Sequence, residues 1–226
     1  MSPRMTFLQH SEHDVPGVLG RLAGDAGWEV VVCRADLGVG SLPGPRSFDA
    51  LVVMGSDEST IDPTVTWIGP ERKLVAEAVA SAVPVLGVCF GGQLLAQILG
   101  GRVTRAVRPE IGWRTIKSAD PHRIPEGPWL VWHEDAFTAP PGAEALAGTD
   151  VSLHAFVSGI HTGVQFHPEV TGEIVSHWVD NAKARGHLDP GQADELLAGF
   201  DADGHGPEAQ TAKLFEGFLE RTGCTS

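Results

Sequence analysis

The residues best suited to chemistry in this chain are a cysteine placed between glycines and a histidine two positions before a glutamate. Cys89 follows the apolar stretch 85–88 and precedes a helical pattern, with Gly87 and Gly91 two positions to either side. A nucleophile on a sharp strand-to-helix turn needs small residues at those positions, because the backbone doubles back there. The positive end of the helix also favours the thiolate, the reactive form of cysteine. The pattern predicts a nucleophile elbow that presents Cys89.

The general base that such a thiol needs lies at the end of a second apolar stretch, where His167, Pro168 and Glu169 follow one another. In this arrangement His167 takes the thiol proton and later protonates the leaving group, while Glu169 accepts the other ring N–H and fixes the tautomer. Pro168 favours an extended conformation at the residue before it, and extended geometry puts side chains two apart on the same side. We therefore predict a catalytic triad of Cys89, His167 and Glu169.

Composition limits the class of protein. A length of 226 residues favours one sizeable domain, and a net charge of −13, from 29 acidic and 16 basic residues, argues against nucleic acid and anionic membranes as partners. No apolar run reaches about 18 residues, and residues 1–9 lack the features of a signal peptide. The three widely spaced cysteines suit a reducing compartment. We expect a soluble, cytoplasmic protein.

The first half of the chain alternates predicted strands and helices. Continuous apolar runs predict strands at 5–9, 29–33, 50–54 and 85–88. Helices are predicted at 15–26, with Asp14 as N-cap, and at 71–82. Such alternation is typical of an α/β fold with a doubly wound, mostly parallel central sheet and flanking helices.

The second half is predicted to be mostly β at first and then helical. Short strand candidates lie at 115–116, 129–131, 151–157 and 160–166. Helical spacing of apolar residues covers 173–184, 193–200 and 211–218, with a turn-rich linker at 201–206. We expect residues 1–186 to form the main domain and 187–226 a C-terminal helical extension packed on it. Whether this extension caps the core or binds a partner stays open.

Three segments resemble the class I glutamine amidotransferase family, in particular the GMP synthase glutaminase and its stand-alone relatives. Residues 87–93 (GVCFGGQ) are similar to its nucleophile motif and 166–169 (FHPE) to its histidine and glutamate motif, while 54–59 (MGSDES) stand where the family has a Gly-Gly-Pro-Glu-Ser loop. In order and spacing the resemblance covers residues from about 5 to 180. It implies a flavodoxin-like architecture with extra antiparallel strands and C-terminal helices.

The resemblance also implies an oxyanion hole, in which two backbone N–H groups hold the charge of the tetrahedral intermediate. Transferred to this chain, the donors are Phe90, after the nucleophile, and Ser56 in the glycine loop, with Gly55 as the flexible neighbour. This sequence departs from the family where Ser56 replaces a glycine and Asp57 a proline. A serine amide still donates, but serine adopts a positive φ at higher cost than glycine.

Further residues match positions that contact the substrate in the family. Gln93 matches the glutamine of the elbow helix, and His133 and Asp135 match a His-Gly-Asp segment near the amino-acid end of the substrate. The stretch around Glu110 resembles a Glu-Ile-Gly-Trp segment of stand-alone relatives with a structural role. The other histidines show no metal-ligand spacing, so we predict neither a metal nor a cofactor.

Together these features predict an enzyme that hydrolyses the γ-carboxamide of glutamine through a Cys89 thioester, releasing glutamate and ammonia. Ammonia would then pass to a separate synthase partner. The same triad also suits a γ-glutamyl peptidase or hydrolase with a larger leaving group. A third alternative is a catalytically silent regulatory relative that keeps the fold and binds a ligand.

Overall fold

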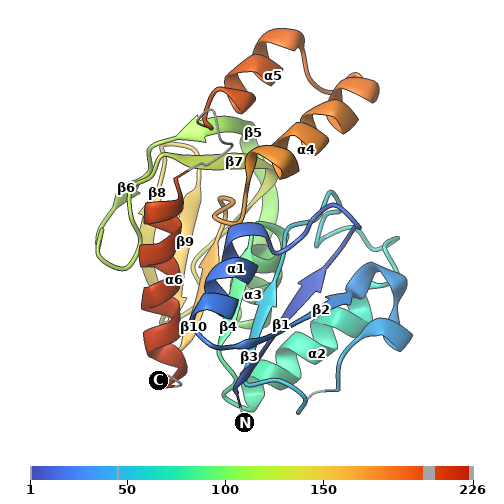
Figure 1. Cartoon of the computed structure of the whole chain (residues 1–226), viewed down its shortest axis with the longest axis vertical. Helices are drawn as coiled ribbons and strands as arrows, with labels where there is room; N and C mark the ends of the chain where they lie inside the picture. The colour runs from blue at the N-terminus through green and yellow to red at the C-terminus, as the bar shows by residue number, and fades with distance from the viewer. Residues whose placement is uncertain (1, 45, 201–206, 224–226) are drawn as a thin grey trace.

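The computed structural model describes residues 2–44, 46–200 and 207–223, which fold around an eight-stranded sheet (Figure 1). Its strands are β1 (Arg4–Gln9), β2 (Glu29–Arg34), β3 (Ala50–Val53), β4 (Val85–Val88), β6 (Lys117–Ser118), β8 (Glu144–Gly148), β9 (Leu153–Ser158) and β10 (His161–Val164). The order is β2-β1-β3-β4-β10-β9-β8-β6, and the first five strands run parallel. The remaining three pair antiparallel. The predicted α/β fold with a mostly parallel sheet is confirmed.

Helices cover both faces of this sheet. The described residues form helices α1 (Gly17–Asp25), α2 (Ile68–Ala80), α3 (Phe90–Ile98), α4 (Gly172–Ala184), α5 (Pro190–Leu197) and α6 (Glu208–Thr222), with short 3₁₀ helices at Ala35–Leu37 and Val39–Ser41. One hydrophobic cluster joins α1 and α6 to the sheet, and a second joins α2 and α3 to its other face. In Figure 1 α6 lies beside α1, although the two helices come from opposite ends of the chain.

A separate two-stranded sheet pairs β5 (Val103–Arg114) with β7 (Trp129–Phe137). The sequence patterns missed β5 and β8, and found only the start of β7. In β5 the cause is an irregular stretch between Arg105 and Glu110, together with Pro109 and Gly112, which break the alternation that predicts a strand. Helices α4 and α5 extend beyond the central sheet and lie next to this hairpin (Figure 1).

The predicted N-cap of α1 is wrong. The N-cap residue is Pro16, which offers no side-chain acceptor, and the helix begins at Gly17 rather than after Asp14. Gly17 has a φ of +50°, and a Cβ there would lie 2.0 Å from the carbonyl oxygen of Glu169. The N–H of Val18 donates to that same oxygen at 2.9 Å. A tertiary contact, rather than a local cap, therefore defines the start of this helix.

The predicted strand at 115–116 is wrong, because these residues form the connection between β5 and β6. The other predicted elements are found with shifted ends: α2 begins three residues before the predicted 71, and α5 covers 190–197 in place of 193–200. Residues 201–206, predicted as a linker, and Cys224 lie outside the described residues. Among the described residues, no helix is long and apolar enough to cross a bilayer.

Candidate functional site

Three loops meet at the carboxyl edge of the parallel strands. Gly55 follows β3, Cys89 follows β4, and His167 follows β10, and these strands are neighbours in the sheet. The carboxyl ends of adjacent parallel strands are where open α/β sheets place their ligand sites. The sheet order therefore brings together groups that lie far apart in the sequence.

Cys89 sits on a strained turn between β4 and α3, with φ +49° and ψ −106°. A Cβ on Gly87 would lie 2.4 Å from the carbonyl oxygen of Gly91, and one on Gly91 would lie 2.0 Å from that of Val53. Only glycine fits at both positions, as the elbow pattern requires. The N–H of Cys89 donates to the carbonyl of Val164 at 2.8 Å, which ties the turn to β10.

His167 and Glu169 form a buried pair, with the Nδ1 atom of His167 2.8 Å from the Oε1 atom of Glu169. Their side chains are 6% and 3% exposed. Burial lowers the pKa of His167, but the charge of Glu169 and the neighbouring Cys89 outweigh this effect, so its pKa is raised well above the ordinary value. A protonated His167 beside Cys89 is suited to give a proton to a leaving group.

The chain that carries this pair is held by two helices. The carbonyl of Glu169 accepts the N–H of Val18 in α1. The carbonyl of Pro168 accepts the hydroxyl of Thr211 in α6 at 2.9 Å, and Thr211 is buried. These bonds fix the backbone on which the imidazole and the carboxylate stand.

The glycine loop passes close to both reactive groups. A Cβ on Gly55 would lie 3.0 Å from the Cε1 atom of His167 and 3.8 Å from the Cβ of Cys89. Ser56 is not among the residues with positive φ, so the strain that serine would suffer there does not arise. Within the described ranges, the backbone N–H groups of Ser56 and Phe90 donate to no protein acceptor. Both are free to bind a ligand oxygen.

Two of the residues matched to substrate contacts lie near Cys89. The Nε2 atom of Gln93 is 3.3 Å from the carbonyl of Asp135 and 3.4 Å from the side-chain oxygen of Gln165. Gln165 in turn donates to the Sγ atom of Cys89 at 3.6 Å. The Asp135 carboxylate accepts the hydroxyl of Ser59 from the glycine loop. Sequence reasoning missed Gln165, whose signal is a polar residue within the apolar stretch before the histidine.

His133 is turned toward a different group of side chains. Its Nδ1 atom is 2.9 Å from the carbonyl of Asp135, and its Nε2 atom faces the Oε2 atom of Glu110 at 3.5 Å. His154 contacts the same carboxylate oxygen at 3.0 Å. The structure thus gathers Glu110, His133 and His154 from three different strands, which no spacing in the sequence reveals.

These three residues could hold a metal ion, since their ligand atoms lie within 4.8 Å of one another. The Glu110 carboxylate, however, already accepts hydrogen bonds from Thr149, Ser152 and His154. Burial raises its pKa, but the bonds from His154 and Ser152 prevail and hold it at about 2. Burial and the nearby His154 lower the pKa of His133 to about 4. Internal hydrogen bonds therefore satisfy the carboxylate without an ion.

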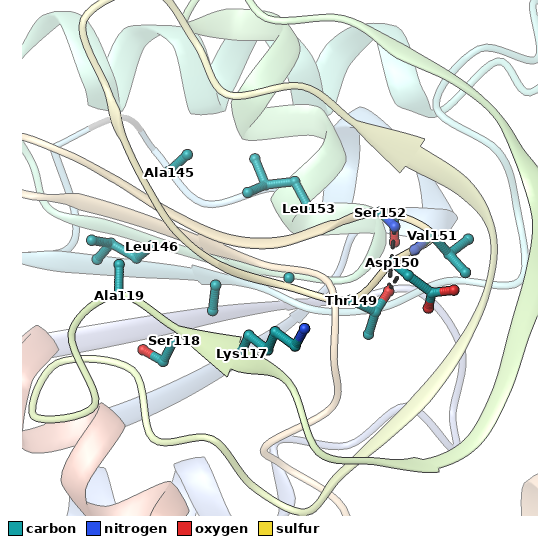
Figure 2. A pocket seen from close by; sticks show the side chains of 12 residues that line it. Lys117, Ser118, Ala119, Ala145, Leu146, Thr149, Asp150, Val151, Ser152 and Leu153 are labelled. Carbon is teal, nitrogen blue, oxygen red and sulfur yellow. Dashed lines mark hydrogen bonds between the residues drawn. The ribbon is translucent and has the colours of Figure 1, made fainter.

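A surface depression of about 590 Å³ lies elsewhere, along β6, β8 and the turn 149–153 (Figure 2). In that turn the Thr149 hydroxyl accepts the N–H groups of Val151 and Ser152. None of the predicted site residues lines this depression. The chemistry expected of the chain is concentrated at the strand edge instead.

A thiol on a strand-to-helix elbow, next to a buried histidine–carboxylate pair in an α/β protein, is an arrangement suited to nucleophilic attack by cysteine. Residues 31–181 match the family model of class I glutamine amidotransferases. The chain belongs to this family.

Relatives support this assignment. The chain is 38% identical over 165 residues to the glutamine-hydrolysing GMP synthase of Thermus thermophilus. The matched region covers 66% of this chain but only 31% of the relative. It is 32% identical over 134 residues to a glutamine-hydrolysing GMP synthase subunit from Sulfurisphaera tokodaii, with 55% of this chain and 69% of the relative covered. The chain thus spans about a third of the length of the Thermus synthase and most of the Sulfurisphaera protein.

Solved structures agree over the whole chain. A glutamine amidotransferase from Methylobacillus flagellatus superposes with a TM-score of 0.86 at 27% identity, covering 98% of this chain and 95% of the other. A glutamine amidotransferase from Thermotoga maritima gives a TM-score of 0.82 at 23% identity, covering 98% of each chain, and supports the fold. The similarity therefore extends beyond residue 181, through the C-terminal helices.

Proposed function

We propose that this protein hydrolyses glutamine to glutamate and ammonia. The observation that carries the proposal is the meeting of Cys89, on its elbow, with the buried His167–Glu169 pair and the glycine loop. Cys89 attacks the carboxamide carbon, the C–N bond breaks as His167 protonates the departing ammonia, and a γ-glutamyl thioester remains. Water, activated by His167, then cleaves the thioester and regenerates the thiol.

The other residues have supporting roles in this proposal. The free N–H groups of Ser56 and Phe90 hold the oxyanion of the two tetrahedral intermediates. Gln93, His133 and Asp135 are proposed to bind or to shape the pocket for the amino-acid end of the substrate. Gln93 and Asp135 are buried next to Gln165 and Cys89, which supports this role for them. The ring of His133 faces Glu110 instead.

Steady-state release of glutamate and ammonia from glutamine, by the wild-type protein and by Cys89→Ala, tests the proposal. We expect the variant to lose at least about 10⁴-fold in turnover, the scale of losing the nucleophile of a triad. Cys33→Ala is the matched control, because Cys33 is a half-buried free thiol far from the elbow in the fold, on β2. Equal turnover by wild type and Cys89→Ala would refute the assignment.

The same assay, run with γ-glutamyl dipeptides, tests the alternative activity. A higher kcat/KM for a dipeptide than for glutamine would identify a γ-glutamyl hydrolase with the same triad. Absence of Cys89-dependent turnover on every substrate would favour a regulatory relative instead.

We also propose that the ammonia is delivered to a separate synthase protein. Support comes from the relatives in Sulfurisphaera tokodaii and Sulfolobus acidocaldarius, which are named as subunits of a GMP synthase and are matched over 69% and 78% of their length. Glutaminase rates measured with and without an added ATP-dependent synthase from the same source test this. A partner should raise the rate and should form a complex detectable by size-exclusion chromatography; if neither happens, free ammonia is the product.

A further inference from the structure

A second buried histidine–carboxylate pair lies directly beneath the glycine loop. The Nε2 atom of His10 is 2.9 Å from the Oε1 atom of Glu71 in α2, and its Nδ1 atom is 2.7 Å from the carbonyl oxygen of Gly55. Both side chains of the pair have 0% exposure. The spacing of the histidines in the sequence indicates only a surface or structural residue at His10.

The donors of this pair can be assigned from its partners. A carbonyl oxygen only accepts, so Nδ1 of His10 must carry a hydrogen to bond Gly55. The Nε2 atom on the other side of the ring pairs with the Glu71 carboxyl group. Burial lowers the pKa of His10, but the charge and hydrogen bond of Glu71 and the bond to Gly55 prevail and raise it. His10 thus donates its Nδ1–H to Gly55 and is held by Glu71 through Nε2.

His10 contacts Phe90 and the Gly55 carbonyl, which belongs to the same peptide as the N–H of Ser56. Its ring packs against Phe90, with ring centroids 4.8 Å apart, and stacks on Trp67 at 5.0 Å. Its hydrogen bond holds the carbonyl of the peptide that joins Gly55 to Ser56. That loop is also tied to the elbow helix, because the carbonyl of Met54 accepts the N–H of Gly91 at 3.2 Å.

Peptide geometry turns this contact into a constraint on the oxyanion hole. In a planar trans peptide the C=O and the next N–H point in opposite directions. With the Gly55 carbonyl held on the His10 side, the Ser56 N–H points away from His10. A flip of this peptide would break the bond to a fully buried donor, which is costly.

We infer that His10, held by Glu71, is a positioning residue that keeps the Gly55–Ser56 peptide turned so that the Ser56 N–H serves the oxyanion. The inference rests on the proposed function, because it assigns a role within that acyl-transfer chemistry. It makes the oxyanion hole of this chain preformed, through a side chain that never touches the substrate.

Two substitutions of His10 by residues of similar size test the hydrogen bond to Gly55 separately from the other contacts of the ring. His10→Asn places an amide where Nδ1 stands and keeps a donor for Gly55, whereas His10→Gln extends its amide toward Glu71 and loses that donor. Both variants remove the ring that packs on Phe90, so each controls for the packing lost in the other. His10→Gln keeps a polar partner for Glu71, whereas His10→Asn leaves that carboxyl group without its hydrogen bond.

Each variant is compared with the wild type in two stoichiometric reactions of Cys89. Acetylation by p-nitrophenyl acetate passes through a tetrahedral oxyanion, with the C–S bond forming and p-nitrophenolate leaving. Alkylation by iodoacetamide displaces iodide from a saturated carbon and forms no oxyanion. Mass spectrometry of the Cys89 peptide follows both reactions and excludes the other thiols, and neither probe requires that glutamine be the substrate.

We expect Cys89 to be acetylated about 10- to 100-fold more slowly in His10→Gln than in His10→Asn. This effect is smaller than the loss in rate of about 10²- to 10³-fold that follows removal of a whole oxyanion donor. Alkylation should stay within about twofold across all three proteins. Equal acetylation rates in the two variants, or acetylation and alkylation that fall together, would overturn the inference. If the wild type fails to hydrolyse glutamine, the proposed function falls, while the comparison of acetylation rates still decides the role of His10.

Discussion

At the residue scale, the site depends on a protonated imidazole kept in a buried environment. His167 loses hydration on burial, which disfavours its charged form, yet Glu169 at 2.8 Å more than compensates. The ring can therefore keep its proton until the leaving group needs it. His10 and Glu71 form a second buried histidine–carboxyl pair at the glycine loop, which acts in positioning rather than proton transfer.

Replacing Glu169 with Gln should separate these effects at His167. Because the negative charge of Glu169 raises the pKa of His167, its loss should lower that pKa and move the alkaline limb of the kcat profile to lower pH. We expect kcat at neutral pH to fall about 100-fold, since the histidine also loses its orienting partner. Steady-state kinetics across pH measures both. Glu216→Gln, at an exposed position of α6, is the control, and an alkaline limb that does not move would contradict this origin of the shift.

At the element scale, the elbow exists because three backbone segments approach more closely than a side chain allows. The Gly91→Ala change would push a methyl group to 2.0 Å from the carbonyl of Val53, at a position where backbone faces backbone. We expect it to destabilise the protein by about 3 kcal/mol or more, the upper range for overpacking. Gly24→Ala, at an exposed position of α1 with open space around it, should be neutral or stabilising by up to about 1 kcal/mol. Urea unfolding of the pair gives the difference; similar values would contradict the packing account.

Helix α6 is linked to the triad by one hydroxyl group. Thr211→Val keeps the shape of this buried side chain but removes its bond to the carbonyl of Pro168. We expect a loss of about 1 kcal/mol in unfolding free energy, typical of one hydrogen bond, and a several-fold lower kcat with an unchanged KM. We expect the kinetic effect because the carbonyl of Pro168, which lies between His167 and Glu169 in the chain, is no longer held by this hydrogen bond. A loss of stability with an unchanged kcat would show that α6 supports the fold without influencing the triad.

At the scale of the whole molecule, the C-terminal part of the chain completes the core. Leu214, Phe215 and Phe218 on α6 are buried in the same hydrophobic cluster as the face of the sheet covered by α1. Of the two roles left open for this extension, packing of this kind favours a cap over a free docking arm. Removing it would expose that face of the sheet to water.

Phe218→Ala tests this role without deleting the helix. Phe218 has 0% exposure, and truncating such a side chain costs about 3–5 kcal/mol through lost burial and a cavity. Thermal unfolding should show a markedly lower Tm than that of wild type. Glu216→Ala, two positions away and exposed, should leave Tm nearly unchanged. If Phe218→Ala unfolds like Glu216→Ala, the helix does not stabilise the domain.

Sequence patterns succeeded where the signal is local and failed where it is not. Strands β3 and β4 were predictable because strands buried on both faces are continuously apolar. Strand β5 was not, because Pro109, Gly112 and an irregular stretch interrupt its pattern. Asp14 has the side chain of an N-cap, but a contact between Gly17 and Glu169 decided where the helix begins.

By itself, the sequence determined the α/β class, the membership of the family, and the residues proposed as nucleophile, base and orienting carboxylate. The class follows from the alternation of apolar runs and helical patterns, and the site residues follow from short motifs, in which glycines two positions from Cys89 or a Pro between His167 and Glu169 restrict the backbone directly. Only the tertiary structure decided the contacts between distant segments. His10 meets Gly55 across 45 positions and Thr211 meets Pro168 across 43, because sheet order and helix packing, rather than spacing along the chain, determine which buried polar groups become partners.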